Sequence, residues 1–266
     1  MIATGPNIKL SELIVDESAP DGDYDAQLKA YQKRLKKVSM AFRRGNDRAV
    51  IVLEGWDAAG KGGLIRRMGW ALDPRQLKVW PIAAPTKAEL DQHYLNRFWQ
   101  RLPPRRSIAC FDRSWYGRVL VERVEGYARH GEWQRAYHEI NEFERLLADD
   151  GVAMIKLFLH ITPEEQLRRF KARYDEPVKR WKLTHDDFRN RAKWPAYEAA
   201  IDDMIAKTST DIAPWHVIAS TNKKRARLEA LDVILTALEA DCDLSIPEMK
   251  PDLAELAEQH FSELEE

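Results

Sequence analysis

A glycine-rich loop directly after an apolar strand constrains this chain more than any other feature. Residues 55–63 read Gly-Trp-Asp-Ala-Ala-Gly-Lys-Gly-Gly, and residues 49–53 before them are all apolar. The spacing Gly-x-x-x-x-Gly-Lys is typical of a P-loop, in which backbone N–H groups bind a phosphate and the lysine adds positive charge. Such a loop joins a strand to a helix, so this segment predicts an α/β fold with a phosphate site.

One position of this glycine loop departs from the usual pattern. Gly62 stands where a Ser or Thr normally gives magnesium a hydroxyl ligand. Asp57, inside the loop, is a candidate replacement for that ligand. The phosphate ligands predicted from this segment are Gly55, Ala58, Ala59, Gly60, Lys61, Gly62 and Gly63.

Strand-like runs alternate with segments of helical periodicity along the chain. The runs lie at residues 49–53, 79–83, 107–111, 152–159 and 215–220. This alternation predicts a mostly parallel sheet of about five strands with helices on both faces. Helical spacing of apolar residues also predicts a helix over 25–44, and a short acidic helix is expected over 253–264. Capping residues mark four further helix starts, at Thr86, Thr162, Thr184 and Asn222.

The 266 residues suit one large domain with extensions. We expect an irregular N-terminal arm over 1–22, a P-loop domain over 23–240 and an acidic tail over 241–266. The net charge of −1 argues against a general nucleic-acid or membrane-surface binder. Two cysteines cannot build a disulfide framework, and no signal segment or membrane span is apparent, so a cytoplasmic protein is expected.

A second polar segment follows the third strand-like run. Residues 111–118 read Phe-Asp-Arg-Ser-Trp-Tyr-Gly-Arg. Ligands of open α/β sheets gather beyond the carboxyl ends of the strands, so this segment is expected to meet the glycine loop. Asp112 and Asp57 together predict a site for Mg²⁺, with Mn²⁺ as a substitute, and Arg113 is a candidate phosphate ligand. The alternatives are a helix N-cap for Asp112 and a surface ion pair for Arg113.

A cationic segment over 168–193 is expected to form a lid of two helices with a break at Pro177. It holds ten cations and four anions. Cations on a lid over the site would neutralise the negative charge of a transferred phosphoryl group or bind a polyanion. The predicted ligands here are Arg168, Arg173, Lys179, Arg180 and Lys182, with Arg118 from the preceding segment. The alternative is a solvated helical hairpin whose charges bind nothing.

Two other kinds of site are not expected. The seven histidines lack metal-ligand spacing, which argues against a zinc site. Ser114 has no visible histidine and acid partners, which argues against a hydrolase triad. Most of the nine tryptophans are expected in the core rather than stacked on bases.

Three segments in this order resemble the polyphosphate kinase type 2 family: residues 55–63, residues 111–118, and Lys-Arg-Trp-Lys at 179–182. The resemblance extends over about 31–238 and implies a three-layer, thymidylate-kinase-like P-loop fold. It also implies magnesium-assisted transfer of a phosphoryl group between inorganic polyphosphate and a nucleotide. Asp57 and Asp112 would then organise the metal, Lys61 and Arg113 would hold phosphates, and the missing hydroxyl would be normal.

The run 117–126 is similar to family members that phosphorylate AMP to ADP, so AMP is the expected acceptor. An enzyme specific for ADP or GDP is the first alternative, with other purine nucleotides as acceptors. An ATP-dependent nucleoside monophosphate kinase and a non-catalytic polyphosphate-binding protein also stay open. A homo-oligomer is expected, with the N-terminal helix and the acidic tail in the subunit contacts.

Overall fold

Five parallel strands form the centre of the molecule in a computed structural model, which describes residues 2–13, 18–240 and 242–261. They are β2 (Arg48–Gly55), β3 (Leu77–Pro81), β4 (Ser107–Asp112), β5 (Val152–His160) and β6 (Trp215–Ala219). The sheet order is β1-β6-β5-β2-β4-β3, so β2, which leads into the glycine loop, is central. The prediction of a mostly parallel sheet is confirmed.

A sixth strand, β1 (Ile2–Thr4), pairs antiparallel with β6 at the edge of the sheet. The prediction of an irregular arm over 1–22 is therefore wrong at this strand, and also at the short 3-10 helix η1 (Leu10–Glu12). Residues 1 and 14–17 of the predicted arm lie outside the described residues. A strand of three residues is too short to show an alternating pattern, and its pairing depends on the distant β6.

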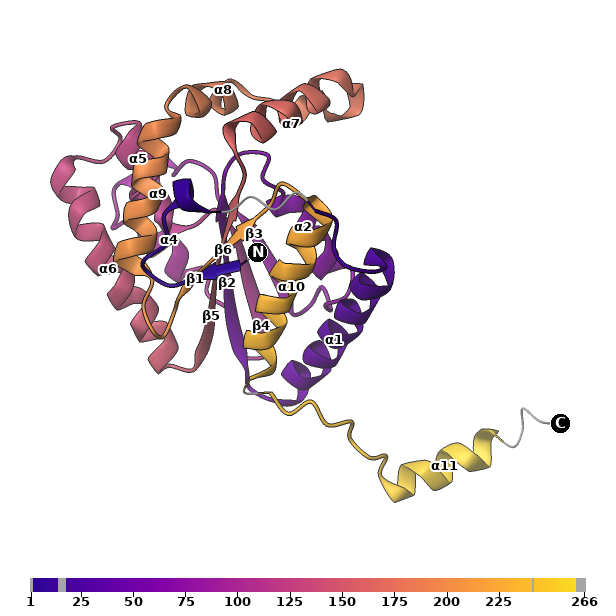
Figure 1. Ribbon diagram of the computed structural model, residues 1–266. Helices are drawn as coiled ribbons and strands as arrows, with labels where there is room; N and C mark the ends of the chain where they lie inside the picture. Colours follow the sequence, from indigo (N-terminus) through magenta and orange to yellow (C-terminus); the bar gives the residue numbers. More distant parts are fainter. Residues whose placement is uncertain (1, 14–17, 241, 262–266) are drawn as a thin grey trace.

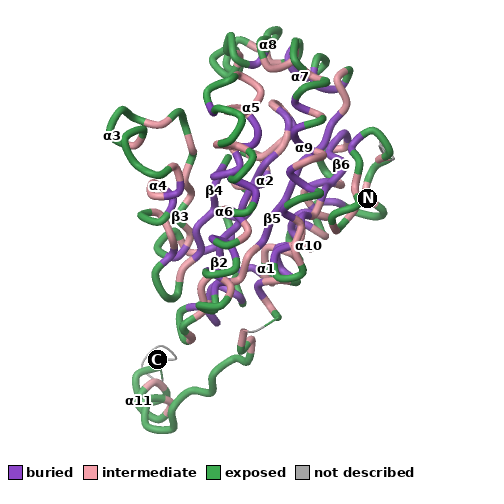
Figure 2. Tube along the Cα trace, turned by 90° about the vertical axis from the view of Figure 1, so that its left-hand side faces the viewer, coloured by how far each residue is buried: buried purple, intermediate pink, exposed green. Residues whose placement is uncertain are grey.

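Helices cover both faces of the sheet (Figure 1). On one face α1 (Tyr24–Arg44), α2 (Lys61–Gly69) and α10 (Lys223–Glu239) pack together. The opposite face carries α5 (Val121–Val124), α6 (His130–Asp149) and α9 (Trp194–Thr208). Figure 2 shows the buried residues concentrated on the strands and on the helix faces toward them. This is the predicted three-layer α/β architecture.

Shorter elements lie beyond the ends of the strands. The β3–β4 connection contains α3 (Lys87–Leu90) and α4 (Asn96–Trp99), and the 3-10 helix η2 (Trp115–Arg118) follows β4. Above the carboxyl edge, α7 (Pro163–Asp175), η3 (Pro177–Lys182) and α8 (His185–Ala192) form a helical hairpin. The predicted helices and the break at Pro177 are confirmed. No helix in the described ranges is long and apolar enough to cross a bilayer.

The C-terminal helix α11 (Pro251–Phe261) lies away from the body of the molecule (Figure 1), and none of its described residues is buried. It begins two residues before the predicted start, because a proline fits the first turn of a helix. Residues 241 and 262–266 of the predicted tail and helix lie outside the described residues. The homo-oligomer stays a prediction.

A buried ion pair ties η2 to the sheet. Lys156 on β5 has no exposed surface, and its ammonium donates to Glu144 (2.7 Å), to the Tyr116 hydroxyl (2.9 Å) and to the Thr208 carbonyl (2.6 Å). Glu144 also accepts from the Trp115 indole (3.0 Å) and from Tyr116 (2.7 Å). Burial lowers the pKa of Lys156, while Glu144 opposes that shift by favouring the charged amine. This network anchors Trp115 and Tyr116 of the 111–118 segment.

Candidate active site

The backbone of the glycine loop turns sharply between β2 and α2. Gly55 has a φ of 143°, and a Cβ there would lie 2.5 Å from the carbonyl oxygen of Leu159. Gly60 has a φ of 121° where it caps α2, and Ala58 also has a positive φ, of 65°. Only glycine tolerates the first two positions without strain. The turn brings the loop to the positive end of the α2 dipole, which favours an anion.

Lys61 begins α2 and reaches back over the loop. Its ammonium donates to the carbonyl oxygens of Gly55 (2.7 Å) and Trp56 (3.4 Å). The side chain therefore lies across the loop and brings a positive charge to the mouth of the turn. Its role as a phosphate ligand stays a prediction.

Asp57 connects the loop to two other parts of the molecule. The Arg113 guanidinium lies 3.1 Å from its Oδ1, and the Asn190 amide of α8 donates to Oδ2 at 3.1 Å. Burial acts to raise the pKa of Asp57, but Lys61, Arg113 and the Asn190 hydrogen bond outweigh burial and lower it overall. The structure thus brings Asp57, Lys61 and Arg113 together, and the predicted meeting of the two sequence segments is found.

Asp112 and Glu54 lie beside this cluster. Asp112 ends β4 opposite Leu53 of β2, and Glu54 is the next residue of β2. Glu54 is buried and accepts a hydrogen bond from the Ser114 hydroxyl (2.7 Å). Burial raises the pKa of Glu54, and the charges of Lys61 and Arg113 oppose that rise. Glu54 was not among the predicted site residues, although a carboxylate at the end of an apolar strand was a usable signal.

The alternative role of Asp112 as a helix N-cap is not observed. Ser114 caps η2, with its side chain accepting from the Tyr116 N–H. No group of three or more metal-binding side chains occurs in the part of the chain that the structure describes. Magnesium commonly uses one or two protein carboxylates and takes its other ligands from water and substrate phosphates, so Asp57 and Asp112 stay candidate ligands for it.

Arg169 of α7 is buried and donates hydrogen bonds to the backbone of the glycine loop. Its side chain is 4% exposed, and one guanidinium nitrogen donates to the carbonyls of Ala58 (2.9 Å) and Ala59 (3.0 Å). The other terminal nitrogen donates to the carbonyls of Ser220 (2.6 Å) and Thr221 (2.9 Å). The C=O and N–H of a trans peptide point in opposite directions. The hydrogen bond from Arg169 to the Ala59 carbonyl therefore turns the N–H of Gly60 away from Arg169. Arg169 therefore orients the loop.

The sequence does not distinguish Arg169 from its neighbour Arg168, which is 69% exposed. The predicted lid ligands contact other residues of the hairpin: Arg168 pairs with Glu165, Arg173 donates to the Lys182 carbonyl, Lys179 pairs with Glu176, Arg180 donates to the Tyr174 carbonyl, and Lys182 lies over the Trp181 ring. Arg118 pairs with Glu122 (3.1 Å) and covers the Tyr94 ring. The hairpin reaches the loop through Gln166, Arg169 and Asn190 instead.

Trp56 of the loop also contacts α9, the helix that follows the hairpin. Its ring stacks on Trp194, the first residue of α9, with centroids 3.6 Å apart and planes 8° from parallel. Its indole N–H donates to Nδ1 of His160 (3.1 Å). Trp56 is buried, as are Trp115 and Trp215, but three tryptophans are half-buried and three are exposed, so the prediction that most tryptophans lie in the core is wrong. Trp181 of the hairpin is 76% exposed.

His160 should make stability depend on pH. Burial lowers the pKa of His160 to about 4, below the usual value near 6.5, so the histidine contributes stability above about pH 6.5 that is lost as the pH falls toward 4. Unfolding in urea should show about 2 kcal/mol of this loss between pH 6.5 and 5. His160→Gln keeps a hydrogen-bond acceptor for Trp56 but cannot titrate in this range, so this variant should not show the loss of about 2 kcal/mol in stability between pH 6.5 and 5. Equal pH dependence in both proteins would contradict the assignment.

A family model described as Polyphosphate kinase 2 matches residues 18–244. The chain is 52% identical over 217 residues to a polyphosphate:AMP phosphotransferase of Pseudomonas syringae pv. tomato, covering 82% of this chain and 44% of that protein. It is 40% identical over 226 residues to a GDP-polyphosphate phosphotransferase of Mycolicibacterium smegmatis, covering 85% and 80%. The chain thus spans under half the length of the first relative.

Two solved structures are also similar. A putative polyphosphate kinase 2 from Pseudomonas aeruginosa has a TM-score of 0.83 and 48% sequence identity, covering 87% of this chain and 50% of that one. Polyphosphate kinase 2 from Arthrobacter aurescens has a TM-score of 0.87 and 31% identity, covering 96% and 94%. The second match includes nearly the whole of both chains.

Proposed function

The chain belongs to the polyphosphate kinase 2 family, and we propose on that basis that it transfers a phosphoryl group from inorganic polyphosphate to a purine nucleotide. Its fold is the three-layer P-loop kinase fold. The observation that carries the proposal is the cluster at the carboxyl edge of the sheet. There, Asp57 lies 3.1 Å from Arg113, and Lys61 crosses the same loop.

AMP is the proposed acceptor. Relatives named polyphosphate:AMP phosphotransferase are 50–52% identical to this chain, whereas relatives named for ADP or GDP are 37–40% identical. In the reaction, an oxygen of the AMP phosphate attacks the terminal phosphorus of the polyphosphate. The bond to the next phosphate breaks, leaving ADP and a chain shorter by one unit.

The side chains of the site supply charge and position. Lys61 and Arg113 neutralise negative charge on the reacting phosphates. Magnesium, with manganese as a substitute, is the proposed cofactor; Asp57 and Asp112 would hold it, and it would supply further charge neutralisation. The attacking phosphate is already ionised at neutral pH, so no general base is required. The hairpin of α7 and α8 limits the access of water.

The test is a comparison of donors and acceptors. The purified protein is incubated with magnesium, long-chain polyphosphate and AMP, ADP, GMP or GDP separately, and the nucleotide products are separated. We expect ADP from AMP as the fastest reaction. ATP from ADP alone would favour the diphosphate-specific alternative. Phosphorylation of AMP by ATP and not by polyphosphate would overturn the proposal, as would binding of polyphosphate without any transfer.

A further inference from the structure

Asn190 of α8 links the hairpin to the carboxylate of Asp57 in the glycine loop. Its amide nitrogen donates to Oδ2 of Asp57 at 3.1 Å, and its amide oxygen accepts from the Tyr197 hydroxyl of α9, also at 3.1 Å. An ionised carboxylate can only accept and a hydroxyl can donate, so these two partners determine which way the amide group faces. Both ends of the Asn190 side chain therefore have a partner.

Glu125, the residue that follows α5, holds Tyr197 from the other side. Tyr197 is buried, and its hydroxyl lies 3.3 Å from one carboxylate oxygen of Glu125, whose other oxygen accepts from Lys193 at 2.8 Å. Burial and the negative charge of Glu125 raise the pKa of Tyr197, so the hydroxyl keeps its proton at neutral pH. A row of polar contacts thus runs from Glu125 through Tyr197 and Asn190 to the glycine loop.

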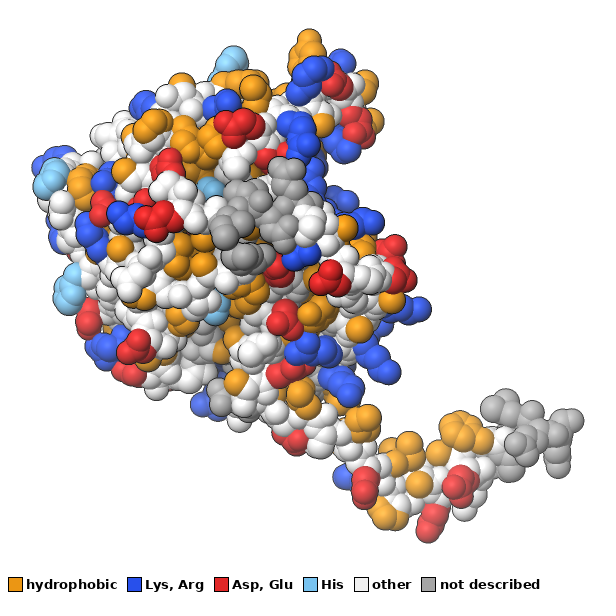
Figure 3. Space-filling model, viewed as in Figure 1, with side chains coloured by type: hydrophobic (Ala, Val, Ile, Leu, Met, Phe, Trp, Pro, Cys, Tyr) orange, Lys and Arg blue, Asp and Glu red, His pale blue; other side chains and the backbone are white. Residues whose placement is uncertain are grey.

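Asn190 is a neutral residue within a cationic segment. Figure 3 shows Lys and Arg side chains on the hairpin, at the top of the molecule. The cations on either side of Asn190 in the sequence have other partners: Arg189 pairs with Asp186 (2.9 Å), and Arg191 donates to a backbone carbonyl at the start of α7. An uncharged donor can orient the carboxylate of Asp57 without neutralising it, so both oxygens keep lone pairs for a metal ion.

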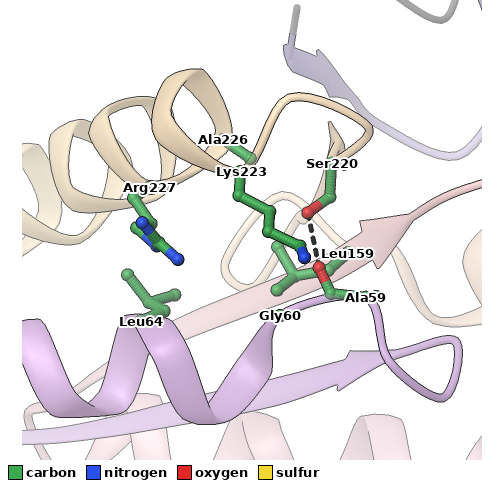
Figure 4. A pocket seen from close by; sticks show the side chains of 8 residues that line it. All are labelled: Ala59, Gly60, Leu64, Leu159, Ser220, Lys223, Ala226 and Arg227. Atoms are coloured by element: carbon green, nitrogen blue, oxygen red, sulfur yellow. Dashed lines mark hydrogen bonds between the residues drawn. The ribbon is translucent and has the colours of Figure 1, made fainter. Parts of the chain in front are cut away.

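The backbone of the glycine loop is held without Asn190. The Ala59 carbonyl accepts from the Ser220 hydroxyl at 2.6 Å (Figure 4) and from Arg169 at 3.0 Å. Asn190, by contrast, donates to the side chain of Asp57. Removal of the Asn190 amide should therefore release one oxygen of the Asp57 carboxylate and leave the loop in place.

We propose that Asn190 is a positioning residue that directs the Asp57 carboxylate toward the magnesium ion of phosphoryl transfer, and that Tyr197 holds Asn190 in place. This inference rests on the proposed function and adds two residues to its site. Replacing a residue that orients a metal ligand by hydrogen bonding typically changes metal affinity or activity by roughly 10–100-fold. The hairpin would then act on the metal site as well as limiting the access of water.

The first test measures metal binding without turnover. Mn²⁺ is titrated into the protein in the absence of polyphosphate and nucleotide, and free Mn²⁺ is followed by electron paramagnetic resonance. Asn190→Ala should weaken Mn²⁺ binding about tenfold, and Tyr197→Phe, which removes one supporting hydrogen bond, about threefold. Asn141→Ala is the matched control, because the Asn141 amide donates to the Lys207 carbonyl (2.9 Å) outside the site and should leave binding unchanged.

A double variant separates positioning from a general loss of structure. If Tyr197 acts through Asn190, Asn190→Ala/Tyr197→Phe should bind Mn²⁺ no more weakly than Asn190→Ala alone. In AMP phosphorylation from polyphosphate, Asn190→Ala should lower kcat about tenfold, while the KM for AMP changes less than about threefold. Asn190→Ser repeats both measurements if Asn190→Ala is unstable.

Three results would overturn this inference: Mn²⁺ binding by the Asn190 variant equal to that of wild type, additive losses in the double variant, or no Mn²⁺ binding by wild type. A wild-type protein that binds Mn²⁺, and loses affinity on Asn190→Ala, but transfers nothing from polyphosphate would instead contradict the proposed function. The two failures are therefore distinguishable.

Discussion

Asp57→Asn is expected to lower the rate of phosphoryl transfer from polyphosphate at least about a hundredfold, with the protein still folded. Asparagine keeps the size of the side chain and one oxygen for Arg113, but it removes the negative charge. That charge is present at neutral pH, because Lys61 and Arg113 overcome the effect of burial and lower the pKa of Asp57. Initial rates with saturating AMP, and circular dichroism for the fold, measure both parts.

Two further variants sharpen this result. Asp112→Asn should lose activity similarly, and both variants should need more magnesium to reach half of their own maximal rate. Asp73→Asn is the matched control, because Asp73 also pairs with an arginine (Arg75, 2.6 Å), outside the candidate site. Turnover of purified Asp57→Asn close to that of wild type would remove Asp57 from the mechanism.

Lys156→Met is expected to lower the free energy of unfolding by about 3–5 kcal/mol. The substitution leaves the Glu144 carboxylate buried without its ammonium partner, and it also removes the donor to the Thr208 carbonyl. A buried unpaired charge is more costly than the loss of the pair as a whole. Urea unfolding at pH 7 measures the change through the transition midpoint.

Lys171→Met is the control for this experiment. Lys171 also forms an ion pair, with Asp175 at 2.8 Å, but it is 72% exposed, so its loss should change stability by less than about 1 kcal/mol. The double variant Lys156→Met/Glu144→Gln should recover part of the loss, because the unpaired charge is gone. A stability of Lys156→Met within about 1 kcal/mol of wild type would contradict a stabilising role for the pair.

Local chemistry explains which elements the sequence predicts well. Thr86, Thr162, Thr184 and Asn222 each cap the helix that was expected after them, because a cap depends only on the next few residues. The apolar runs at 49–53 and 107–111 likewise lie in central strands. β1 escaped prediction because its pairing partner lies more than two hundred residues away.

The candidate site divides in the same way. The meeting of Asp57 with Arg113 followed from topology, since parallel strands present their carboxyl ends at one edge. The sequence did not predict that Glu54 and Arg169 lie in the site. Both side chains are distinguished by their burial, and adjacent charged residues look alike in a sequence. Lys179, Arg180 and Lys182 were expected to face a phosphate, and that role stays a prediction.

The hydrogen bonds of Arg169 also limit which segments can be exchanged between this chain and its relatives in a chimera. The Arg169 guanidinium donates to the carbonyls of Ala58, Ala59, Ser220 and Thr221. The first half of α7 therefore supports the backbone of the glycine loop. A chimera that takes residues 171–192 from a relative would keep Arg169 and its hydrogen bonds to the loop. A chimera that replaces the hairpin from residue 163 onward would have to supply an arginine at the same position, or the loop would lose its support.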